Sequence, residues 1–281
     1  RDSMPVSKLK NLVILILLLA NLALLGLLIP SRIAAQEQTD SLANALSELC
    51  ESRDVSLSPD AVPDTMTLYA LELGEDPAAD LRAATALLGT EVLAQDDSTR
   101  YLSLYSSSAG TCEIHRDGTL KARLQDQSET GDLSAGARRT LEAMGFAVKS
   151  LGEPVRLRAG VYTLTATQAV LGVPVLSGDL TLTYSNSRLT ELSGLFFTGA
   201  NVLSRVSDTA SISAADAVVA FLAARYDLGW VGSAILSLSQ GYIRSETAAA
   251  AAVHLTPVWL LETDTGAFLV NGITSEVRIF S

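Results

Sequence analysis

The most prominent hydrophobic pattern of the 281-residue chain lies near its start. From Leu12 to Ile29, 18 consecutive residues carry no charge, and Asn21 is the only polar side chain among them. As a helix, this segment would be roughly 27 Å long, close to the hydrocarbon thickness of a bilayer. A long helix of a globular core would have a polar face, which this segment lacks. We therefore predict a transmembrane helix over residues 12–29.

The next segment has the spacing of an amphipathic helix. Between Gln36 and Ser52, hydrophobic residues recur three or four positions apart, with Thr39 or Asp40 able to cap the helix. Pro59 and Pro63 then indicate a loop. We expect residues 30–64 to form a stalk helix and a loop.

A helix followed by antiparallel strands is then predicted three times. Asp76 with Pro77 starts the first helix, Gly145 ends the second, and Ser213 caps the third. The predicted helices span residues 77–88 and 134–144, with the third beginning at 213, and the predicted strands span 66–73, 100–106, 111–115, 119–124, 160–169, 173–184, 189–197, 233–243, 253–262, 266–271 and 276–280. Short turns between successive strands favour antiparallel sheets and an α+β fold.

The placement of polar residues refines this picture. The alternation from Asp179 to Tyr184 predicts a strand with one buried face and one solvent-exposed face. Residues 126–132 are polar throughout, so we place a soft boundary there, between an N-terminal unit (65–130) and a C-terminal unit (131–281).

Charge sets the expected topology. Arg1, Lys8 and Lys10 precede the hydrophobic segment, so the positive-inside rule keeps residues 1–11 in the cytoplasm and places the rest outside it. We therefore expect a single-pass protein of the cell membrane. A cleaved signal peptide is the alternative, but Arg32 and Ile33 suit a cleavage site poorly.

The outer part is acidic. Setting aside three basic residues and one acidic residue in the first 29 leaves 17 basic against 30 acidic residues, a net charge of −13. Such a surface argues against nucleic acid as a partner and against adhesion to anionic lipid headgroups.

The search for catalytic chemistry finds no motif, so we predict no enzyme activity, no catalytic residue, no cofactor and no metal site. His115 and His254 lie in predicted strands without a carboxylate or cysteine at a known spacing. Glu262 and Asp264 are close in sequence, but their segment resembles a strand end and turn, with Asp264 bonding the turn backbone and Gly266 supplying a positive φ.

The two cysteines, Cys50 and Cys112, leave two alternatives open. The expected compartment permits a disulfide between them. Buried free thiols are the other alternative. One cysteine lies in a predicted helix and the other in a predicted strand, so their spacing in sequence does not determine whether they are close.

Two groups of strands resemble a known family. In the C-terminal segment from Leu255 to Thr274, the pattern Pro-x-Trp, strand, Thr-Asp-Thr-Gly, strand, Asn-Gly-x-Thr includes Pro257, Trp259, Asp264, Gly266 and Asn271. The segments 171–175, 180–184 and 188–194 show the pattern G-x-P-V, L-T-x-x-Y, L-x-x-x-S-G. Together with Lys8-Leu9-Lys10-Asn11 before the anchor, they resemble the YycI/YycH regulatory proteins and related PepSY-like modules.

The resemblance implies a non-enzymatic accessory protein of a two-component system that governs cell-wall metabolism. Its expected partners are a membrane sensor histidine kinase and a paralogous accessory protein, and a homodimer or heterodimer stays open. The alternative is a PepSY-like module that binds or inhibits an extracytoplasmic peptidase.

On this resemblance, the anchor itself would contact the kinase helices. Its candidate contact residues are small or polar: Ala20, Asn21, Ala23 and Gly26. Small residues let helices approach closely, and a buried Asn gains from a partner's side chain.

Overall fold

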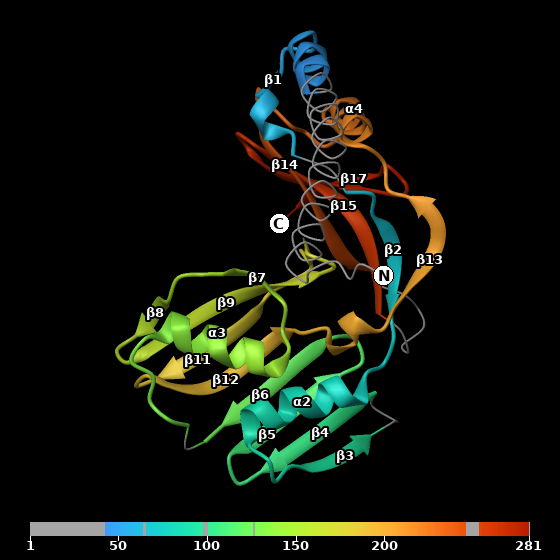
Figure 1. Cartoon of the computed structure of the whole chain (residues 1–281). Coiled ribbons are helices and arrows are strands. Elements are labelled where there is room, and N and C mark those ends of the chain that lie inside the picture. Colours follow the sequence, from blue (N-terminus) through green and yellow to red (C-terminus); the bar gives the residue numbers. More distant parts are fainter. Residues whose placement is uncertain (1–42, 64–65, 98–100, 126, 246–252, 281) are drawn as a thin grey trace, which may run out of the picture.

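Hydrophobic alternation and short turns produce two lobes in a computed structural model of the chain, which describes residues 43–63, 66–97, 101–125, 127–245 and 253–280. Each lobe is a mostly antiparallel sheet with helices packed against it (Figure 1). The predicted α+β class is confirmed for these residues. None of their helices is long and apolar enough to cross a membrane, and the predicted anchor at residues 12–29 lies outside the described ranges.

The lower lobe is one ten-stranded sheet with two helices on one face (Figure 1). Its strands run β10-β9-β11-β12-β6-β5-β4-β3, with β7 and β8 paired to β9. The elements are α2 (Pro77–Leu88), β3 (Leu93–Asp97), β4 (Leu102–Ser107), β5 (Gly110–His115), β6 (Thr119–Leu124), α3 (Leu133–Met144), β7 (Val148–Leu151), β8 (Val155–Arg158), β9 (Val161–Val170), β10 (Val173–Pro174), β11 (Leu180–Ser185) and β12 (Arg188–Leu195).

Local signals set the helices and the buried face of this lobe. Asp76 caps α2 by accepting from the Ala79 N–H, and Gly145 ends α3 in the left-handed conformation. The predicted alternation is confirmed in β11, where Leu180, Leu182 and Tyr184 are buried against the helices.

The predicted boundary at 126–132 does not separate two folding units. Strands on either side of it pair directly, because β6 pairs with β12 from Thr119–Leu195 to Arg123–Glu191. The segment is a loop within one sheet, and polar composition is typical of loops and of domain linkers alike.

The upper lobe combines both ends of the described chain. It contains residues 43–51 as a helix, then β1 (Ser56–Leu57), η1 (Pro59–Ala61), β2 (Tyr69–Leu73), β13 (Leu203–Ala210), α4 (Ala214–Ala224), β14 (Ala234–Ser245), β15 (Val253–Thr263), β16 (Gly266–Asn271) and β17 (Val277–Phe280). A capping box formed by Ser213 and Asp216 starts α4. Phe221 of α4 packs on Trp230 and Phe268, with ring centroids 5.1 and 5.0 Å away.

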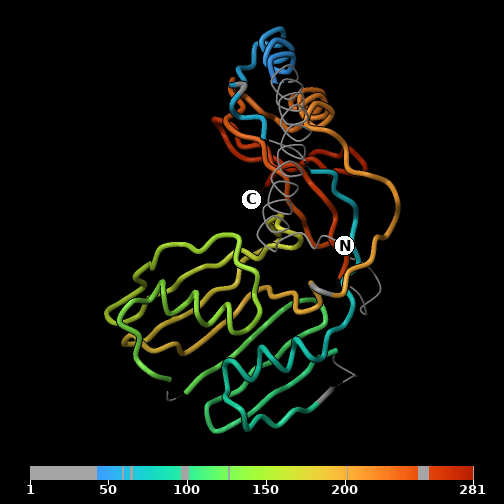
Figure 2. Tube along the Cα trace, viewed as in Figure 1, coloured from blue at the N-terminus to red at the C-terminus, as the bar shows by residue number. Residues whose placement is uncertain are grey.

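The lower lobe is inserted within the upper one. The chain enters it at residues 74–76 and leaves it by the 3-10 helix η2 (Thr198–Asn201), after which β13 returns beside β2. The colour order in Figure 2 shows this: the blue segments, the teal strand β2 and the orange-to-red segments form the upper lobe, and the segments from the teal helix α2 to the gold strand β12 form the lower one. The predicted units 65–130 and 131–281 are therefore corrected to a discontinuous upper lobe and a continuous lower lobe.

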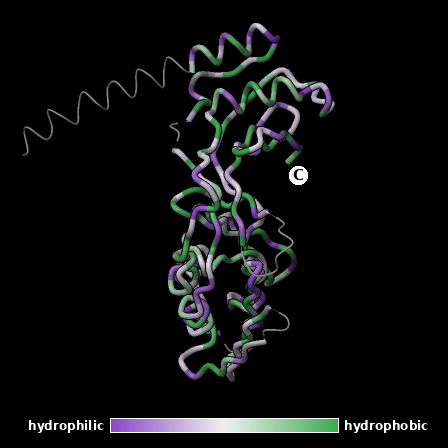
Figure 3. The backbone as a smooth tube through the Cα atoms, turned by 90° about the vertical axis from the view of Figure 1, so that its right-hand side faces the viewer, coloured by the Kyte–Doolittle hydropathy of each residue, from purple (hydrophilic) through white to green (hydrophobic). Residues whose placement is uncertain are grey.

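The junction between the lobes is narrow in the side view (Figure 3). At its centre the two linking segments touch: a Cβ added to Gly199 would lie 1.9 Å from the Gly74 carbonyl oxygen. Arg244 of β14 donates to the carbonyl oxygen of Asp117 at 2.9 Å and lies 3.3 Å from its carboxylate. Gln168 binds the backbone of Phe197 at the point where the chain leaves the lower lobe.

The three predicted helices and the predicted strands are found at their positions, with differences at their edges. They do not form three separate units, because β2 lies in the upper lobe and the other strands of the first two units share one sheet. The predicted strand 173–184 is divided into β10 and β11 by a turn. The structure adds β1, β3, β7, β8 and β13, which the sequence pattern did not indicate. β8 and most of β13 are exposed on both faces, so neither shows a clear alternation of apolar and polar residues.

Candidate functional site

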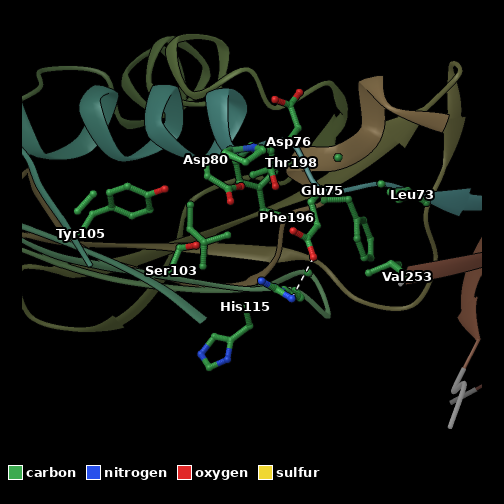
Figure 4. Close-up of a pocket in the computed structure, with 18 of the residues that line it drawn as sticks. Leu73, Glu75, Asp76, Asp80, Ser103, Tyr105, His115, Phe196, Thr198 and Val253 are labelled. Atoms are coloured by element: carbon green, nitrogen blue, oxygen red, sulfur yellow. Dashed lines mark ion pairs between the residues drawn. The ribbon is translucent and has the colours of Figure 1, made fainter. Parts of the chain in front are cut away.

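A cavity of about 230 Å³ lies at the top of the lower lobe, where that lobe faces the upper one (Figure 4). It is enclosed by the first turn of α2, the inner face of β3, β4 and β5, and the segment that leaves β12. Its lining residues are Leu73, Gly74, Glu75, Asp76, Pro77, Asp80, Ala94, Gln95, Ser103, Tyr105, Ile114, His115, Arg116, Gly118, Phe196, Phe197, Thr198, Gly199 and Val253.

Small side chains on α2 bring this helix close to the sheet. Ala79, Ala83 and Ala84 are each at most 3% exposed and lie on the face that packs against the strands. Asp80 lies next to this alanine face, so its carboxyl group is directed toward the cavity (Figure 4).

Asp80 is the most unusual group in the cavity. Its Oδ1 atom is buried and has no hydrogen-bond partner among the described residues. Burial raises the pKa of Asp80 above its ordinary 3.8; a hydrogen bond from the Thr198 side chain offsets part of this, and the charges of Asp76 and Glu75 add to it. The cavity thus contains a carboxyl group with an open acceptor position.

The other two carboxylates already have partners. Asp76 accepts from the Ala79 N–H at 3.0 Å as the helix cap. Glu75 forms an ion pair with Arg116 at 3.0 Å, and the Arg116 guanidinium lies 5.5 Å from the centre of the Tyr101 ring. Half of the Glu75 side chain is exposed, so this pair forms the rim of the cavity and contributes little to stability.

The rest of the wall is partly apolar. Phe196, Ile114 and Val253 supply hydrophobic surface, and β4 directs Ser103 and Tyr105 to the same side of the sheet. Figure 4 shows the Tyr105 hydroxyl pointing toward Asp80. The cavity therefore combines an acidic end with hydroxyl groups and aromatic surface.

These groups can bind a ligand, but they do not form a known catalytic arrangement. His115 contributes to the wall, yet its ring points away from the cavity (Figure 4), with Nε2 3.9 Å from Glu113. Ser103 therefore has no histidine beside it as a base. Nor do the described ranges contain a group of three or more His, Cys, Asp or Glu side chains that could hold a metal ion.

The family-like residues named from the sequence lie elsewhere, in the β15–β16 hairpin of the upper lobe. Trp259 is 1% exposed, and its indole N–H donates to the Ile212 carbonyl oxygen at 3.0 Å. Pro257 is within β15, where its carbonyl oxygen accepts from the Gly272 N–H. Their roles in this hairpin are structural.

Two further residues of this group shape turns. Asn271 accepts from the Ile273 and Thr274 N–H groups, at 2.8 and 3.1 Å. The predicted positive φ of Gly266 is confirmed at 149°. Asp264 binds Ser233, whose N–H donates at 2.8 Å, and these hydrogen bonds lower the pKa of Asp264.

The histidines and cysteines also have defined places. His254 lies 3.1 Å from Glu72, a carboxylate partner on β2 that sequence spacing could not reveal. Cys50 and Cys112 are both buried and free, the first in the core of the upper lobe and the second in that of the lower lobe. The alternative of free thiols is thus the one observed.

Sequence reasoning missed the cavity and Asp80. A signal was present, since Asp80 precedes Ala83, Ala84 and Leu87 at helical spacing and so belongs to the inner face of α2. The candidate anchor contacts Ala20, Asn21, Ala23 and Gly26 lie outside the described residues.

Known proteins offer little guidance to the role of this cavity. No protein family and no curated protein matches the sequence. Among solved structures, the chain is similar to the Bacillus megaterium YpeB C-terminal domain, with 11% identity, 74% of this chain and 99% of that chain covered, and a TM-score of 0.35. A likeness at this TM-score establishes neither fold nor function, so a functional proposal depends on the residues of the chain itself.

Proposed function

We propose that this chain is a non-enzymatic regulatory protein of the cell membrane that modulates a sensor histidine kinase controlling cell-wall metabolism. Residues 12–29 would anchor it, with residues 1–11 in the cytoplasm and the two lobes outside. The resemblance of its strands to YycI/YycH proteins supports the choice of partner, which is an analogy and not a property of the site.

The observation that carries a regulatory role is the helix of residues 43–51, which follows the proposed anchor. Ala43, Leu46 and Cys50 are at most 4% exposed and belong to the same core as Trp259 and α4. Ser47 adds a hydrogen bond to the Leu57 carbonyl oxygen at 2.8 Å. A helix packed in this way can pass a movement of the lobes toward the anchor, whereas a flexible linker would not.

The junction supplies a place where such a movement could be controlled. A ligand in the cavity would touch Val253 of the upper lobe and α2 of the lower one at once. It would shift the arrangement of the lobes only by binding one arrangement more tightly than another.

The test has two parts. The full chain should co-purify with a histidine kinase from membranes, and deletion of the chain should change kinase output. Replacing residues 12–29 with an unrelated apolar helix should abolish the association while leaving the outer lobes folded. Unchanged kinase output after deletion would contradict the proposal.

The same anchor replacement separates the alternative function. A PepSY-like module that inhibits a peptidase outside the cytoplasm should keep its inhibitory activity when the anchor sequence is changed. Inhibition that survives the replacement, together with the absence of a kinase complex, would favour this alternative.

A further inference from the structure

The cavity at the lobe junction has a chemistry that the proposed regulatory role does not specify. Its polar end consists of Glu75, Asp76 and Asp80, and of these only Asp80 has a buried oxygen without a partner among the described residues. A buried acceptor that lacks a donor is unfavourable and rare in folded proteins. Oδ1 can therefore accept a hydrogen bond from a ligand that enters the cavity.

The charges around this position favour a cation. Glu75 is compensated by Arg116 at 3.0 Å, but within the described part of the chain neither Asp76 nor Asp80 forms an ion pair. A cationic ligand would supply both the missing hydrogen bond and the missing positive charge.

The groups around Asp80 favour one kind of cation over the others. A metal ion needs several ligands, and no suitable group of side chains exists in the described part of the chain. A guanidinium group binds best to a carboxylate with both oxygens open, but the Thr198 side chain already bonds this carboxyl group. A compact ammonium group, with three donors, can donate to Oδ1 of Asp80 and to the hydroxyl oxygen of Ser103, which lines the same cavity.

The apolar part of the cavity lining indicates which kind of group carries the ammonium. Phe196 and Phe197 offer aromatic surface, and Ile114 and Val253 offer aliphatic surface beyond the acidic end. Aromatic faces attract an ammonium group, and an alkyl stem gains from apolar contact. At about 230 Å³, the cavity is smaller than the roughly 300 Å³ at which drug-sized pockets begin.

We propose that this cavity binds a primary ammonium group carried on a short alkyl stem, with Asp80 as its counter-ion. The stem belongs either to a small free amine or to a lysine side chain of a partner. The binding is a property of the two lobes, so it can succeed or fail independently of any association with a kinase.

The decisive experiment is ligand-detected NMR on the full chain in detergent micelles. The probes are n-butylamine and n-butanol, which share a stem and differ in charge. Asp80→Asn, which keeps the shape of the side chain, should weaken n-butylamine binding at least about tenfold and leave n-butanol binding unchanged. The matched control is Asp208→Asn, which removes an exposed carboxylate on β13 and should bind like the wild type.

A second variant keeps the test valid if Asp80→Asn fails to fold. Ser103→Leu fills part of the cavity and keeps Asp80, so it should also reduce n-butylamine binding, with an unchanged circular dichroism spectrum as the folding check. Wild-type protein that shows no n-butylamine binding at about 10 mM would overturn the proposal. Equal binding of n-butylamine by the wild type and Asp80→Asn would do the same, as would equal wild-type affinity for n-butylamine and n-butanol.

Two more probes distinguish the sources of the amine. Tighter binding of Nα-acetyl-lysine amide than of n-butylamine would identify a lysine side chain of a partner, and its Nε-acetylated form should then not bind. Tighter binding of n-butylamine would identify a free amine. Either result supports the ammonium site.

Discussion

The side chain of Gln168 makes both hydrogen bonds that a neighbouring strand would make with Phe197. Its Nε2 donates to the Phe197 carbonyl oxygen at 3.0 Å, and its Oε1 accepts from the Phe197 N–H at 2.8 Å. Gln168 is 3% exposed, so no solvent competes for these bonds. Phe197 lies where the chain leaves the lower lobe, and Gln168 therefore fixes the direction of that exit.

Replacing Gln168 should be costly. Gln168→Leu would leave the buried Phe197 N–H without a partner, and such a loss costs about 1–3 kcal/mol. The Phe197 carbonyl oxygen would keep only the longer of its two hydrogen bonds, from the Ala200 N–H at 3.3 Å. We expect the free energy of unfolding to fall by about 1–3 kcal/mol in urea denaturation. Gln125→Leu, at an exposed position, is the control and should change it by less than about 0.5 kcal/mol. Equal stabilities of the two variants would contradict this role for Gln168.

The contact between Gly199 and Gly74 predicts a second effect. Gly199→Ala would place a methyl group 1.9 Å from the Gly74 carbonyl oxygen, so the two linking segments must separate. We expect a loss of about 3 kcal/mol or more, measured by thermal unfolding. Gly131→Ala is the matched control, because a methyl group there meets nothing within 4 Å, and it should leave stability nearly unchanged. A native-like melting temperature for Gly199→Ala would show that the junction tolerates separation.

The raised pKa of Asp80 predicts how stability depends on pH. The folded state holds the Asp80 proton more tightly than the unfolded state does, so this group lowers stability as pH rises from 3.8 through its raised value. Asp80→Asn should remove that part of the slope and should be more stable than the wild type at neutral pH. The Asp80→Asn variant keeps Asp76, Glu75 and Arg116, so the other charges of the cavity are the same in both proteins. Urea titrations between about pH 4 and pH 8 measure the difference, and parallel curves for both proteins would refute it.

The buried thiol of Cys112 predicts resistance to alkylation. Burial, with a smaller contribution from the charges of Asp80 and Glu113, raises the pKa of Cys112 to about 12. Only about one thiol in ten thousand would be ionised at pH 8, and the thiolate is the reactive form. We expect iodoacetamide to modify Cys112 in urea but not in the native protein, as read by peptide mass spectrometry. Rapid modification of the native protein would show that this part of the core opens readily.

Local features of the sequence were sufficient for much of the fold. Asp76 and Pro77 set the start of α2, and the turns after β5 and β11 set two hairpins. Each of these signals lies within a few residues of the structure that it determines.

The arrangement of the lobes and the cavity depend on distant residues. Asp80 and Thr198 meet although 118 positions separate them, and Arg244 reaches Asp117 across the lobes. β13 pairs with β2, although the whole lower lobe lies between them in sequence. Periodicity describes one segment at a time, so it could not predict these pairings.

The insertion of the lower lobe has a structural consequence for the upper one. Leu73 and Leu203 are directly paired across β2 and β13, so these two strands form a β-hairpin whose loop is the entire lower lobe. A turn of two to five residues could close the same hairpin. The upper lobe would then expose Leu71, Tyr242 and Leu255, which now pack against the lower lobe, and polar residues would have to replace them. The lower lobe is thus an insertion at the end of a hairpin of the upper lobe, and the cavity lies at the junction between the two lobes.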